Sequence, residues 1–362
     1  MRAKKTVWID FSPLQIDVMI AQLYLAKERF ELHVISTKEV VNGLPKDLIA
    51  AGLIKSATIL PKDSKFKAIW TAFKQIKSID ADYAVMNDGQ GQSVKWLSLL
   101  GLFLRTEFIG VHHNADKFIF GSLTQSLINL KIKKYFVLAE YILKNLNGKV
   151  SNKFKFSSFY SCLTDYKLLK NENPAELKIA IPGFVEFHRR DYLELVENLS
   201  QGPEKLASNI KFVILGNAGK KDGQELIVKA KAAGLENNFS FYDHFVPLQE
   251  MYQQIDSSDL LMTLIGPKNQ YFDLYKKYKI SGTYSLSIMM ERPLLLHEVY
   301  SDESEFNDWA MYYTENSLVK KLNQWAKDKS EVKSITQKSI EKFKHTFTSQ
   351  SKKYCDFIEK NI

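Results

Sequence analysis

Residues 211–233 of the chain read KFVILGNAGKKDGQELIVKAKAA, and this stretch decides the fold class. It begins with the apolar run Phe212–Leu215, continues through a loop with Gly216 and Gly219, and ends in a helical pattern over Gly223–Ala233. A short buried strand, a glycine-containing turn and a helix make one βα unit of a parallel sheet. The two glycines let the backbone approach a ligand closely, and a plain strand-to-helix turn would explain them equally well.

The same alternation of strand and helix extends from this unit in both directions. It predicts strands at Thr6–Asp10, Leu32–Ser36, Thr58–Leu60, Tyr83–Met86, Glu107–Val111, Tyr135–Leu138, Lys178–Ile181, Lys211–Leu215, Ser240–Tyr242, Leu260–Leu264, Leu294–Leu296 and Met311–Tyr313. It predicts helices at Leu14–Arg29, Lys65–Ile79, Ser93–Leu104, Arg190–Leu199, Gly223–Ala233, Leu248–Ile255, Ser281–Glu291 and Ser317–Lys327. Repeated βα units build doubly wound parallel sheets. We therefore expect an α/β protein with two tandem Rossmann-like domains that face each other across a cleft.

A polar, aromatic and basic segment, Asn147–Lys178, interrupts this rhythm and lacks a long periodic stretch. We interpret it as the last strand of the first domain followed by the linker. The expected domains are residues 1–172 and 173–345. The charged helical tail after Ser330 supplies a C-terminal helix, residues 346–362, that crosses back and packs on the first domain. A single doubly wound enzyme with an appendage is the alternative.

Composition excludes several classes of protein. The 362 residues are 45% hydrophobic and 25% charged, which is typical of a folded chain of about two domains. Cys162 and Cys355 lie far apart with no Cys/His clustering, so we expect neither a disulfide scaffold nor a structural zinc site. The N-terminus shows no signal-peptide pattern, and the longest apolar stretch, Trp96–Leu104, falls well short of the roughly 20 residues that span a bilayer. These features predict a cytoplasmic protein.

The formal net charge of +9 favours an anionic partner, which the charge alone does not identify. Nucleic acid, phospholipid headgroups and a phosphorylated small molecule all fit. The basic stretch Leu127–Lys134 and the apolar Trp96–Leu104 helix would suit peripheral contact with an anionic membrane. In the alternative interpretation the helix is buried in the core and the lysines are simply solvated.

The loop after the Lys178–Ile181 strand carries the first candidate site. Gly183 frees the backbone at the turn, and Arg189 and Arg190 precede a helix. Guanidinium groups beside a helix N-terminus form a favourable binding site for a diphosphate. A solvated arginine pair is the alternative.

The most informative segment is Tyr278–Pro293, which places Lys279, Ser281, Gly282 and Thr283 at the beginning of a helix. Free backbone N–H groups at that position hold phosphate oxygens, and the lysine adds positive charge. A capped helix with an incidental lysine would have the same sequence.

A loop of the second predicted domain carries further candidates. Phe245 and Val246 lie in a loop that could clamp a flat nucleotide base.

In the first domain, His112, His113 and Asn114 follow a strand, and either imidazole could deprotonate an acceptor hydroxyl or hold a phosphate. Asp88 and Gly89 follow another strand, and Ser12 follows the first, so we expect these residues on the acceptor side as well. Hydrogen-bonded structural histidines and helix capping are the alternatives.

Taken together, these motifs resemble the retaining, nucleotide-sugar-dependent glycosyltransferases of the GT-B architecture. The resemblance covers roughly residues 176–300 and is only topological before that. The residues that carry it are Pro182-Gly183 with Arg189-Arg190, Val213-Ile214-Leu215-Gly216, Phe241-Tyr242-Asp243-His244 with Tyr252 and Ser258-Asp259-Leu260, and Tyr278-Lys279-Ile280-Ser281 before Arg292-Pro293.

The resemblance implies that the second domain holds the nucleotide sugar, which serves as a substrate, and that neither a cofactor nor a metal is needed. It assigns the diphosphate to Arg189 or Arg190 and to Lys279, Ser281 and Gly282. Gly216 and Asn217 would lie near the nucleotide, and Tyr278, Phe245 and Val246 would contact it. The acceptor would be a glycan, a lipid-linked sugar or a protein.

One position departs from the family pattern. Many relatives carry two glutamates eight residues apart before the Gly-x-Pro element, and Tyr278 and Leu286 occupy those places here. This leaves open the donor sugar, the retaining or inverting outcome, and the possibility of a non-catalytic homologue. Two classes other than an enzyme are also considered. One is a nucleic-acid-binding protein, but the sequence contains no recognised readout motif. The other is a two-domain protein that binds a small ligand without catalysing a reaction.

Overall fold

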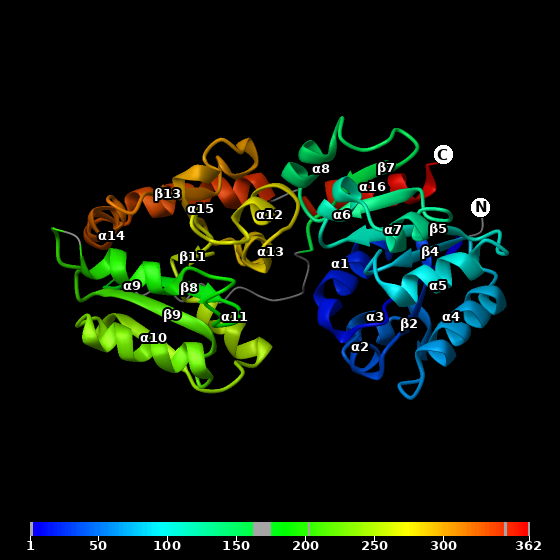
Figure 1. The fold of residues 1–362 in the computed structure, drawn as a ribbon, viewed down its shortest axis with the longest axis horizontal. Helices are drawn as coiled ribbons and strands as arrows, with labels where there is room; N and C mark the ends of the chain where they lie inside the picture. The colour runs from blue at the N-terminus through cyan, green and yellow to red at the C-terminus, as the bar shows by residue number, and fades with distance from the viewer. Residues whose placement is uncertain (1–2, 162–174, 202, 344–345, 361–362) are drawn as a thin grey trace. The chain divides into compact units, whose positions relative to one another are not determined.

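The protein is described from a computed structural model, which covers residues 3–161, 175–201, 203–343 and 346–360 (Figure 1). The chain forms two compact units. Unit 1 comprises Met1–Thr164, Lys277–Ile280 and Thr346–Ile362, and unit 2 comprises Asp165–Lys276 and Ser281–His345. The expected domain boundary at residues 172–173 lies outside the described residues.

Unit 1 is built on a seven-stranded sheet in the order β3-β2-β1-β4-β5-β6-β7, with every neighbouring pair parallel. Its strands are β1 (Lys4–Ile9), β2 (Phe30–Ser36), β3 (Ile54–Ile59), β4 (Tyr83–Met86), β5 (Glu107–His112), β6 (Lys134–Val137) and β7 (Lys155–Ser158). Its helices are η1 (Pro13–Gln15), α1 (Ile16–Ala26), α2 (Lys38–Asn42), α3 (Lys46–Ala50), α4 (Lys65–Ile79), α5 (Gln92–Gly101), α6 (Asp116–Phe120), α7 (Leu123–Ile128), α8 (Glu140–Leu146) and α16 (Thr346–Glu359).

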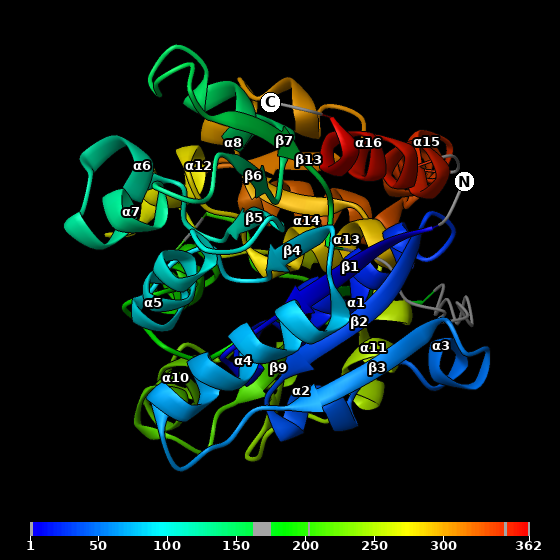
Figure 2. The ribbon, with the colours of Figure 1, turned by 90° about the vertical axis from the view of Figure 1, so that its right-hand side faces the viewer.

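Helices cover both faces of this sheet, which is why its central strands are almost continuously apolar. Val7 and Ile9 of β1 face a core shared with α4, α5 and α7, whereas Trp8 between them faces a core shared with α1, α3 and α16. Figure 2 shows α4 and α5 together on one face of the sheet. The alternation along β1 therefore separates two hydrophobic layers.

Unit 2 repeats the architecture on a six-stranded parallel sheet in the order β10-β9-β8-β11-β12-β13. Its strands are β8 (Leu177–Pro182), β9 (Ile210–Asn217), β10 (Phe239–Tyr242), β11 (Leu260–Met262), β12 (Leu294–His297) and β13 (Ala310–Tyr313). Its helices are α9 (Tyr192–Ser200), α10 (Lys221–Ala232), η2 (Glu236–Asn238), α11 (Leu248–Asp256), α12 (Phe272–Lys277), α13 (Gly282–Met289), η3 (Glu298–Tyr300), η4 (Ser304–Phe306), α14 (Leu318–Lys327) and α15 (Ser330–Phe343).

Each sheet reverses its strand order once, between β1 and β4 in unit 1 and between β8 and β11 in unit 2. Loops that leave the two strands at such a point diverge to opposite faces of the sheet, which opens a crevice at the carboxyl edge. Each unit therefore has one edge position where a ligand site is expected.

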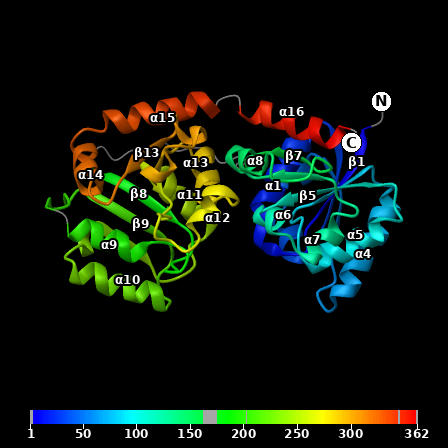
Figure 3. The same ribbon diagram turned by 45° about the horizontal axis from the view of Figure 1, so that its top comes forward.

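The last helix of the chain belongs to unit 1, although the preceding one belongs to unit 2. In Figure 3, α16 lies beside α1 and β7. Tyr354 accepts a hydrogen bond from the indole Nε1 of Trp8 at 3.1 Å and donates one from its hydroxyl to Gln22 Oε1 at 3.0 Å. Phe136 of β6 stacks on the Tyr354 ring, with 4.5 Å between the ring centroids. These buried contacts fasten the C-terminus to the first sheet.

The α/β class is confirmed, and every expected strand is present, with shifts of one or two residues at most ends. The exception is β3, which begins at Ile54, four residues before the expected strand Thr58–Leu60. The expected strand Leu260–Leu264 ends at Met262, because Leu264 has a φ of +51°, which no strand accommodates. The tail after Ser330 forms two helices, α15 and α16. The short helices α2, α3, α6, α7, α8 and α12 were not predicted, because one or two turns show no hydrophobic period.

Candidate functional site

Unit 2 contains a cavity of about 290 Å³ at the point where its strand order reverses. The walls come from the loop after β8, which spans Gly183–Arg190, and from the first turn of α13. Met251 of α11, Ile265 after β11 and Tyr275 of α12 complete them. The cavity thus lies where the topology of a doubly wound sheet predicts a ligand site.

Arg190 supplies positive charge to this cavity. One guanidinium nitrogen, Nη1, donates a hydrogen bond to the backbone carbonyl of Thr263 at 2.7 Å, which anchors the side chain to the loop after β11. Within the described residues, no carboxylate lies within ion-pair distance of it. Gly183, with φ of +120°, lies directly beneath: a Cβ there would stand 2.5 Å from Arg190 Nη2. Glycine at 183 therefore allows both the turn and the position of the guanidinium.

Arg189 also lines the cavity, but its charge is already compensated. Its Nε lies 2.7 Å from Glu186 Oε2, and its guanidinium stands over the ring of Phe184 at 5.9 Å. Arg189 is exposed to solvent, so this ion pair is screened and weak. Arg189 and Arg190 were equivalent candidates in the sequence analysis, but in the structure only Arg189 has a carboxylate partner among the described residues.

The first turn of α13 forms the opposite wall. Ser281 is the N-cap, and its Oγ accepts a hydrogen bond from the backbone N–H of Thr283 at 3.4 Å. A Cβ built on Gly282 would find no atom within 4 Å, so the space above this residue is open. The Thr283 hydroxyl is buried and has no hydrogen-bond partner among the described residues. The N–H of Tyr284 donates to the Ser281 carbonyl at 2.9 Å, so this turn offers an anion the open space at Gly282 and the unsatisfied Thr283 hydroxyl.

Gly216 and Asn217 are the last two residues of β9 and do not line this cavity. A Cβ on Gly216 would lie 2.0 Å from the carbonyl oxygen of Gly183, so glycine at 216 lets the loop after β8 pack against the end of β9. The Oδ1 of Asn217 accepts a hydrogen bond from the N–H of Gly219 at 2.8 Å. Both residues shape the loop beneath the cavity, and their expected contact with a nucleotide stays a prediction.

The two residues expected to clamp a base differ in exposure. Phe245 is 75% exposed and Val246 is buried, and neither lines the cavity. Only the Phe245 ring is accessible to a ligand in this structure.

Tyr278 and Lys279 belong to a short segment that is part of unit 1. The carbonyl of Tyr278 accepts a hydrogen bond from the N–H of Ala115 at 2.9 Å, and that of Lys279 accepts one from the Tyr141 hydroxyl at 2.6 Å. Ile280 packs against the core of unit 1. The segment expected to bind the donor is thus anchored through its backbone on a loop and on α8 of unit 1, and neither the Tyr278 nor the Lys279 side chain lines the cavity of unit 2.

A second polar cluster lies at the carboxyl edge of the unit 1 sheet, where β1, β4 and β5 are neighbours. Asn87 follows β4 and links its members: its Nδ2 donates to Asp10 Oδ2 at 2.5 Å, and its carbonyl accepts from His113 Nε2 at 2.6 Å. Because a carbonyl only accepts, the Nε2 of His113 carries the proton. In the neutral ring, Nδ1 is then left as the proton acceptor.

Asp10 was not among the expected site residues. Burial raises the pKa of its carboxyl to about 6, against the hydrogen bonds from Asn87 and the backbone of Ser12 that favour the charged form. A sequence signal existed, since a carboxylate ending an apolar strand is unusual. Asn87, which joins Asp10 to His113, gave no such signal.

His112 points into the core instead. It is buried against the rings of Phe118 and Tyr135, whose centroids lie 4.5 Å and 5.1 Å from that of the imidazole. Burial lowers the pKa of His112 to about 3, so the ring stays neutral at physiological pH. Of the two expected catalytic histidines, the structure brings only His113 to the polar cluster.

The remaining acceptor-side candidates surround this cluster. The N–H of Ser12 donates to Asp10 Oδ1 at 2.8 Å, and burial raises the pKa of Asp88. The N–H of Gly89 donates to the carbonyl of Val111 at 2.7 Å, and a Cβ at 89 would crowd the backbone of β5. The carbonyl of Asn114 lies 3.3 Å from Nδ1 of His112. Ser12 and Asp88 are therefore near Asp10, whereas Gly89 and Asn114 shape the loops.

The chain matches no family model and no curated protein sequence, but its fold matches solved structures over nearly its whole length. HepE of Anabaena, solved with UDP and glucose, aligns over 98% of both chains with a TM-score of 0.65 and 13% identity. The lipopolysaccharide outer core galactosyltransferase WaaB aligns over 98% of this chain and 99% of its own, with a TM-score of 0.62 and 13% identity. The chain has the GT-B glycosyltransferase fold.

The GT-B fold does not by itself decide the reaction. The N-terminal domain of a trehalose-6-phosphate phosphatase from Candida albicans also matches, with a TM-score of 0.62 and 14% identity over 98% of this chain and 99% of its own. At such low identity the match establishes architecture only. Any assignment of function to this GT-B chain must therefore come from its own residues.

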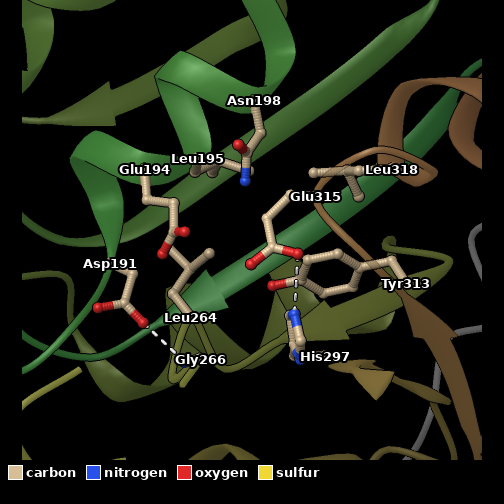
Figure 4. Close-up of a pocket in the computed structure, with 10 residues that line it drawn as sticks. All are labelled: Asp191, Glu194, Leu195, Asn198, Leu264, Gly266, His297, Tyr313, Glu315 and Leu318. Atoms are coloured by element: carbon tan, nitrogen blue, oxygen red, sulfur yellow. Dashed lines mark hydrogen bonds and ion pairs between the residues drawn. The ribbon is translucent and has the colours of Figure 1, made fainter. Parts of the chain in front are cut away.

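Unit 2 also contains a small acidic pocket, which is too small for a nucleotide (Figure 4). Its volume is about 10 Å³, roughly that of one water probe. His297 pairs with Glu315 across 3.3 Å, and Asp191 accepts hydrogen bonds from the N–H of Gly266 at 2.6 Å and from Asn269 Nδ2 at 2.8 Å. Asp191 thereby ties the loop after β8 to the loop after β11, which fixes both walls of the larger cavity.

Proposed function

We propose that the protein transfers a sugar from a nucleoside diphosphate sugar to an acceptor, with the donor diphosphate in the cavity of unit 2. The observation that carries this proposal is the meeting, in one 290 Å³ cavity, of the Arg190 guanidinium, the first turn of α13 and the unpartnered Thr283 hydroxyl. Each of these groups stabilises negative charge on phosphate oxygens. The solved GT-B relative with bound UDP supports the same class of ligand.

The chemistry that these groups supply is stabilisation of the leaving group. When the bond between the sugar and the diphosphate breaks, negative charge accumulates on the departing phosphate oxygens. A fixed guanidinium and a helix N-terminus stabilise that charge without reorganising, so the reaction needs no divalent metal. We expect turnover to be unchanged by EDTA.

The acceptor in this proposal binds over unit 1, at the Asp10, Asn87 and His113 cluster. The His113 ring, whose Nε2 donates to the carbonyl of Asn87, offers Nδ1 to a hydroxyl of the acceptor. Asp10 stabilises positive charge on the ring when it takes that proton. A glycan, a lipid-linked sugar or a protein side chain presents the required hydroxyl, and a screen of these three acceptor classes decides among them.

The test of the donor half is release of the nucleotide from UDP-, GDP- and TDP-sugars, with binding of UDP, GDP, TDP and CMP measured by calorimetry. Arg190→Ala should lower turnover of the preferred donor by about 100-fold, as loss of a transition-state charge partner does elsewhere. Thr283→Val should weaken nucleotide binding. Arg189→Ala should have a smaller effect, because Glu186 already compensates its charge.

Equal turnover of the wild type and Arg190→Ala would contradict the proposal. Binding of a nucleotide without release from any donor would instead indicate the non-catalytic ligand-binding protein. A salt-dependent gel shift with arbitrary DNA or RNA, and no nucleotide binding, would favour the nucleic-acid alternative.

A further inference from the structure

Two helices of unit 1 present large aromatic side chains to solvent. On α4, Phe66 and Trp70 are 71% and 39% exposed, and on and after α5, Trp96 and Phe103 are 53% and 85% exposed. A spacing of four residues places Phe66 and Trp70 on one side of α4, and Phe103 lies in the turn directly after α5. Phe66 and Trp70 thus share the outer side of α4, whereas Ile69 on the inner side is buried in the core.

The two helices lie side by side on one face of the sheet (Figure 2). Their outward aromatic rings therefore belong to one surface, here called the α4–α5 face and defined by residues 64–79 and 92–106. Isolated exposed apolar residues are ordinary on a protein surface, but a group of large rings on adjoining helices marks an interaction site.

The charge on this face is mainly positive. Residues 64–79 contain Lys65, Lys67, Lys74 and Lys77, and residues 92–106 contain Lys95 and Arg105. Lys67 pairs with Asp63 at 2.7 Å, so its charge is compensated, whereas Lys74 and Lys77 are exposed. Lys74 stands 5.6 Å from the Trp70 ring and Lys95 stands 4.5 Å from the Trp96 ring. Cations and exposed aromatics are thus interleaved on the same surface.

We infer that the α4–α5 face docks on an anionic phospholipid surface. Lysines on a helix surface are attracted by the negative potential of phosphate headgroups, and tryptophan prefers the boundary between headgroups and acyl chains. A symmetric contact between two copies would place like charges opposite each other, which disfavours self-association. This inference rests on unit 1 alone and is independent of the proposed donor site.

The basic stretch Leu127–Lys134, which the sequence had suggested for this role, is engaged within the protein. Lys134 is buried, with its Nζ 2.8 Å from Glu107 Oε1 and 2.9 Å from the carbonyl of Ile358. Lys131 donates to the carbonyl of Leu104 at 2.9 Å. The exposed lysines Lys74 and Lys77 of α4 are therefore better placed for headgroups than Lys131 and Lys134 are.

The chain offers an internal reporter of docking. It contains five tryptophans, of which Trp8, Trp309 and Trp325 are buried, whereas Trp70 and Trp96 both lie on the α4–α5 face. Vesicles of phosphatidylcholine with phosphatidylglycerol at equal proportions should shift the tryptophan emission to the blue, and brominated lipid should quench it. Vesicles of phosphatidylcholine alone, or 0.5 M NaCl, should abolish most of the change.

Two variants test the face, and two matched variants on α10 of unit 2 control for them. Phe66→Ser/Phe103→Ser and Lys74→Glu/Lys77→Glu should each lower partitioning into the anionic vesicles by about tenfold or more. Val228→Ser and Lys229→Glu/Lys231→Glu change an exposed apolar residue and two exposed lysines elsewhere, and they should bind like the wild type.

Several outcomes would overturn the inference: no vesicle binding, equal binding to neutral vesicles, or an equal loss in the α10 variants. Self-association in sedimentation that Phe66→Ser/Phe103→Ser abolishes, without vesicle binding, would assign the face to a second copy. Nucleotide binding, measured on the same samples, should be unchanged in all four variants. A failure of docking is therefore distinguishable from a failure of the donor site.

Discussion

Three glycines around the cavity of unit 2 are present for different physical reasons. Gly183 adopts a φ that side chains rarely allow, and Gly216 lies so close to the carbonyl of Gly183 that no Cβ fits. Gly282 is under neither constraint, since the space above it is empty. Glycine thus has three roles here: it permits a turn at 183, a close packing contact at 216 and open space for a ligand at 282.

The pair Gly216→Ala and Gly282→Val separates packing from ligand binding. Gly216→Ala should lower the free energy of unfolding by about 1–3 kcal/mol, because a backbone atom must move to admit the methyl group. Gly282→Val should leave stability nearly unchanged and weaken nucleotide binding, because the valine side chain would occupy the space proposed for the phosphate. Urea denaturation and calorimetry measure the two effects, and a stable Gly216→Ala protein would contradict the packing argument.

Asp10 predicts a specific dependence of stability on pH. Burial raises the pKa of its carboxyl to about 6 from an ordinary value of 3.8. Between these two values the folded protein binds more protons at this group than the unfolded chain does. The free energy of unfolding should therefore fall as pH rises from about 4 to 6, by up to about 3 kcal/mol from this group, and stay level above that.

The comparison that isolates this contribution is wild type against Asp10→Asn, by urea denaturation at several pH values. The difference in unfolding free energy between the two proteins should change over that window and be constant above it. A pH-independent difference would mean that Asp10 titrates at its ordinary value.

At the scale of elements, α16 completes the first sheet's helical cover. Its Tyr354 hydroxyl is one link in a buried chain of hydrogen bonds that runs from Trp8 through Gln22 to Asn87, whose amide Oδ1 accepts from Gln22 Nε2 at 2.6 Å. Asn87 in turn contacts Asp10 and His113. The C-terminal helix and the candidate acceptor site are therefore connected through well-packed polar groups.

Tyr354→Phe should lower the free energy of unfolding by about 1–3 kcal/mol, because the Trp8 Nε1–H and the side-chain oxygen Oε1 of Gln22 would lose their buried partner. Tyr271→Phe, at a partly exposed ring, is the matched control and should have little effect. Thermal and urea unfolding measure both. A neutral Tyr354→Phe would indicate that water replaces the hydroxyl.

At the scale of the whole molecule, neither unit is one continuous segment. Unit 1 includes residues 277–280 and the last helix, both of which come after the beginning of unit 2 in the sequence. No helix in the described part of the chain is long and apolar enough to span a membrane. The fold thus couples the stability of the first sheet to the C-terminus of the chain.

A chain that ends at Phe343 tests this coupling. Loss of α16 should uncover Trp8 and Phe136 and destabilise unit 1, while unit 2 keeps its own core and nucleotide binding. Hydrogen exchange should show lost protection in β1 and β6 with β8 and β9 unchanged. Full protection of β1 in the truncated chain would contradict the expectation.

The order and position of the strands could be predicted from the sequence, because hydrophobic runs and their alternation with helices are local properties. Every strand except β7 overlaps an expected strand, whereas β7 lies in the polar segment Asn147–Lys178 that was interpreted as the last strand of the first domain and the linker. The class of fold follows from the order of the strands. The cavity-facing stretch Ser281–Thr283 could be found for the same reason, since helix N-termini have local signals. Long helices such as α4 were recognisable, and one-turn helices were not.

Only the tertiary structure distinguished residues that look alike along the chain. Arg189 and Arg190 are neighbours, yet among the described residues only Arg189 meets a carboxylate. His112 and His113 are also neighbours, yet His112 at the end of β5 packs in the core, whereas His113 just after it contacts Asn87. The pairing of Asp10 with Asn87 across the reversal point, and the attachment of Tyr278–Ile280 to unit 1, depend on contacts between distant segments. Sequence periodicity is set by neighbours along the chain, whereas charge compensation and burial are set by neighbours in space.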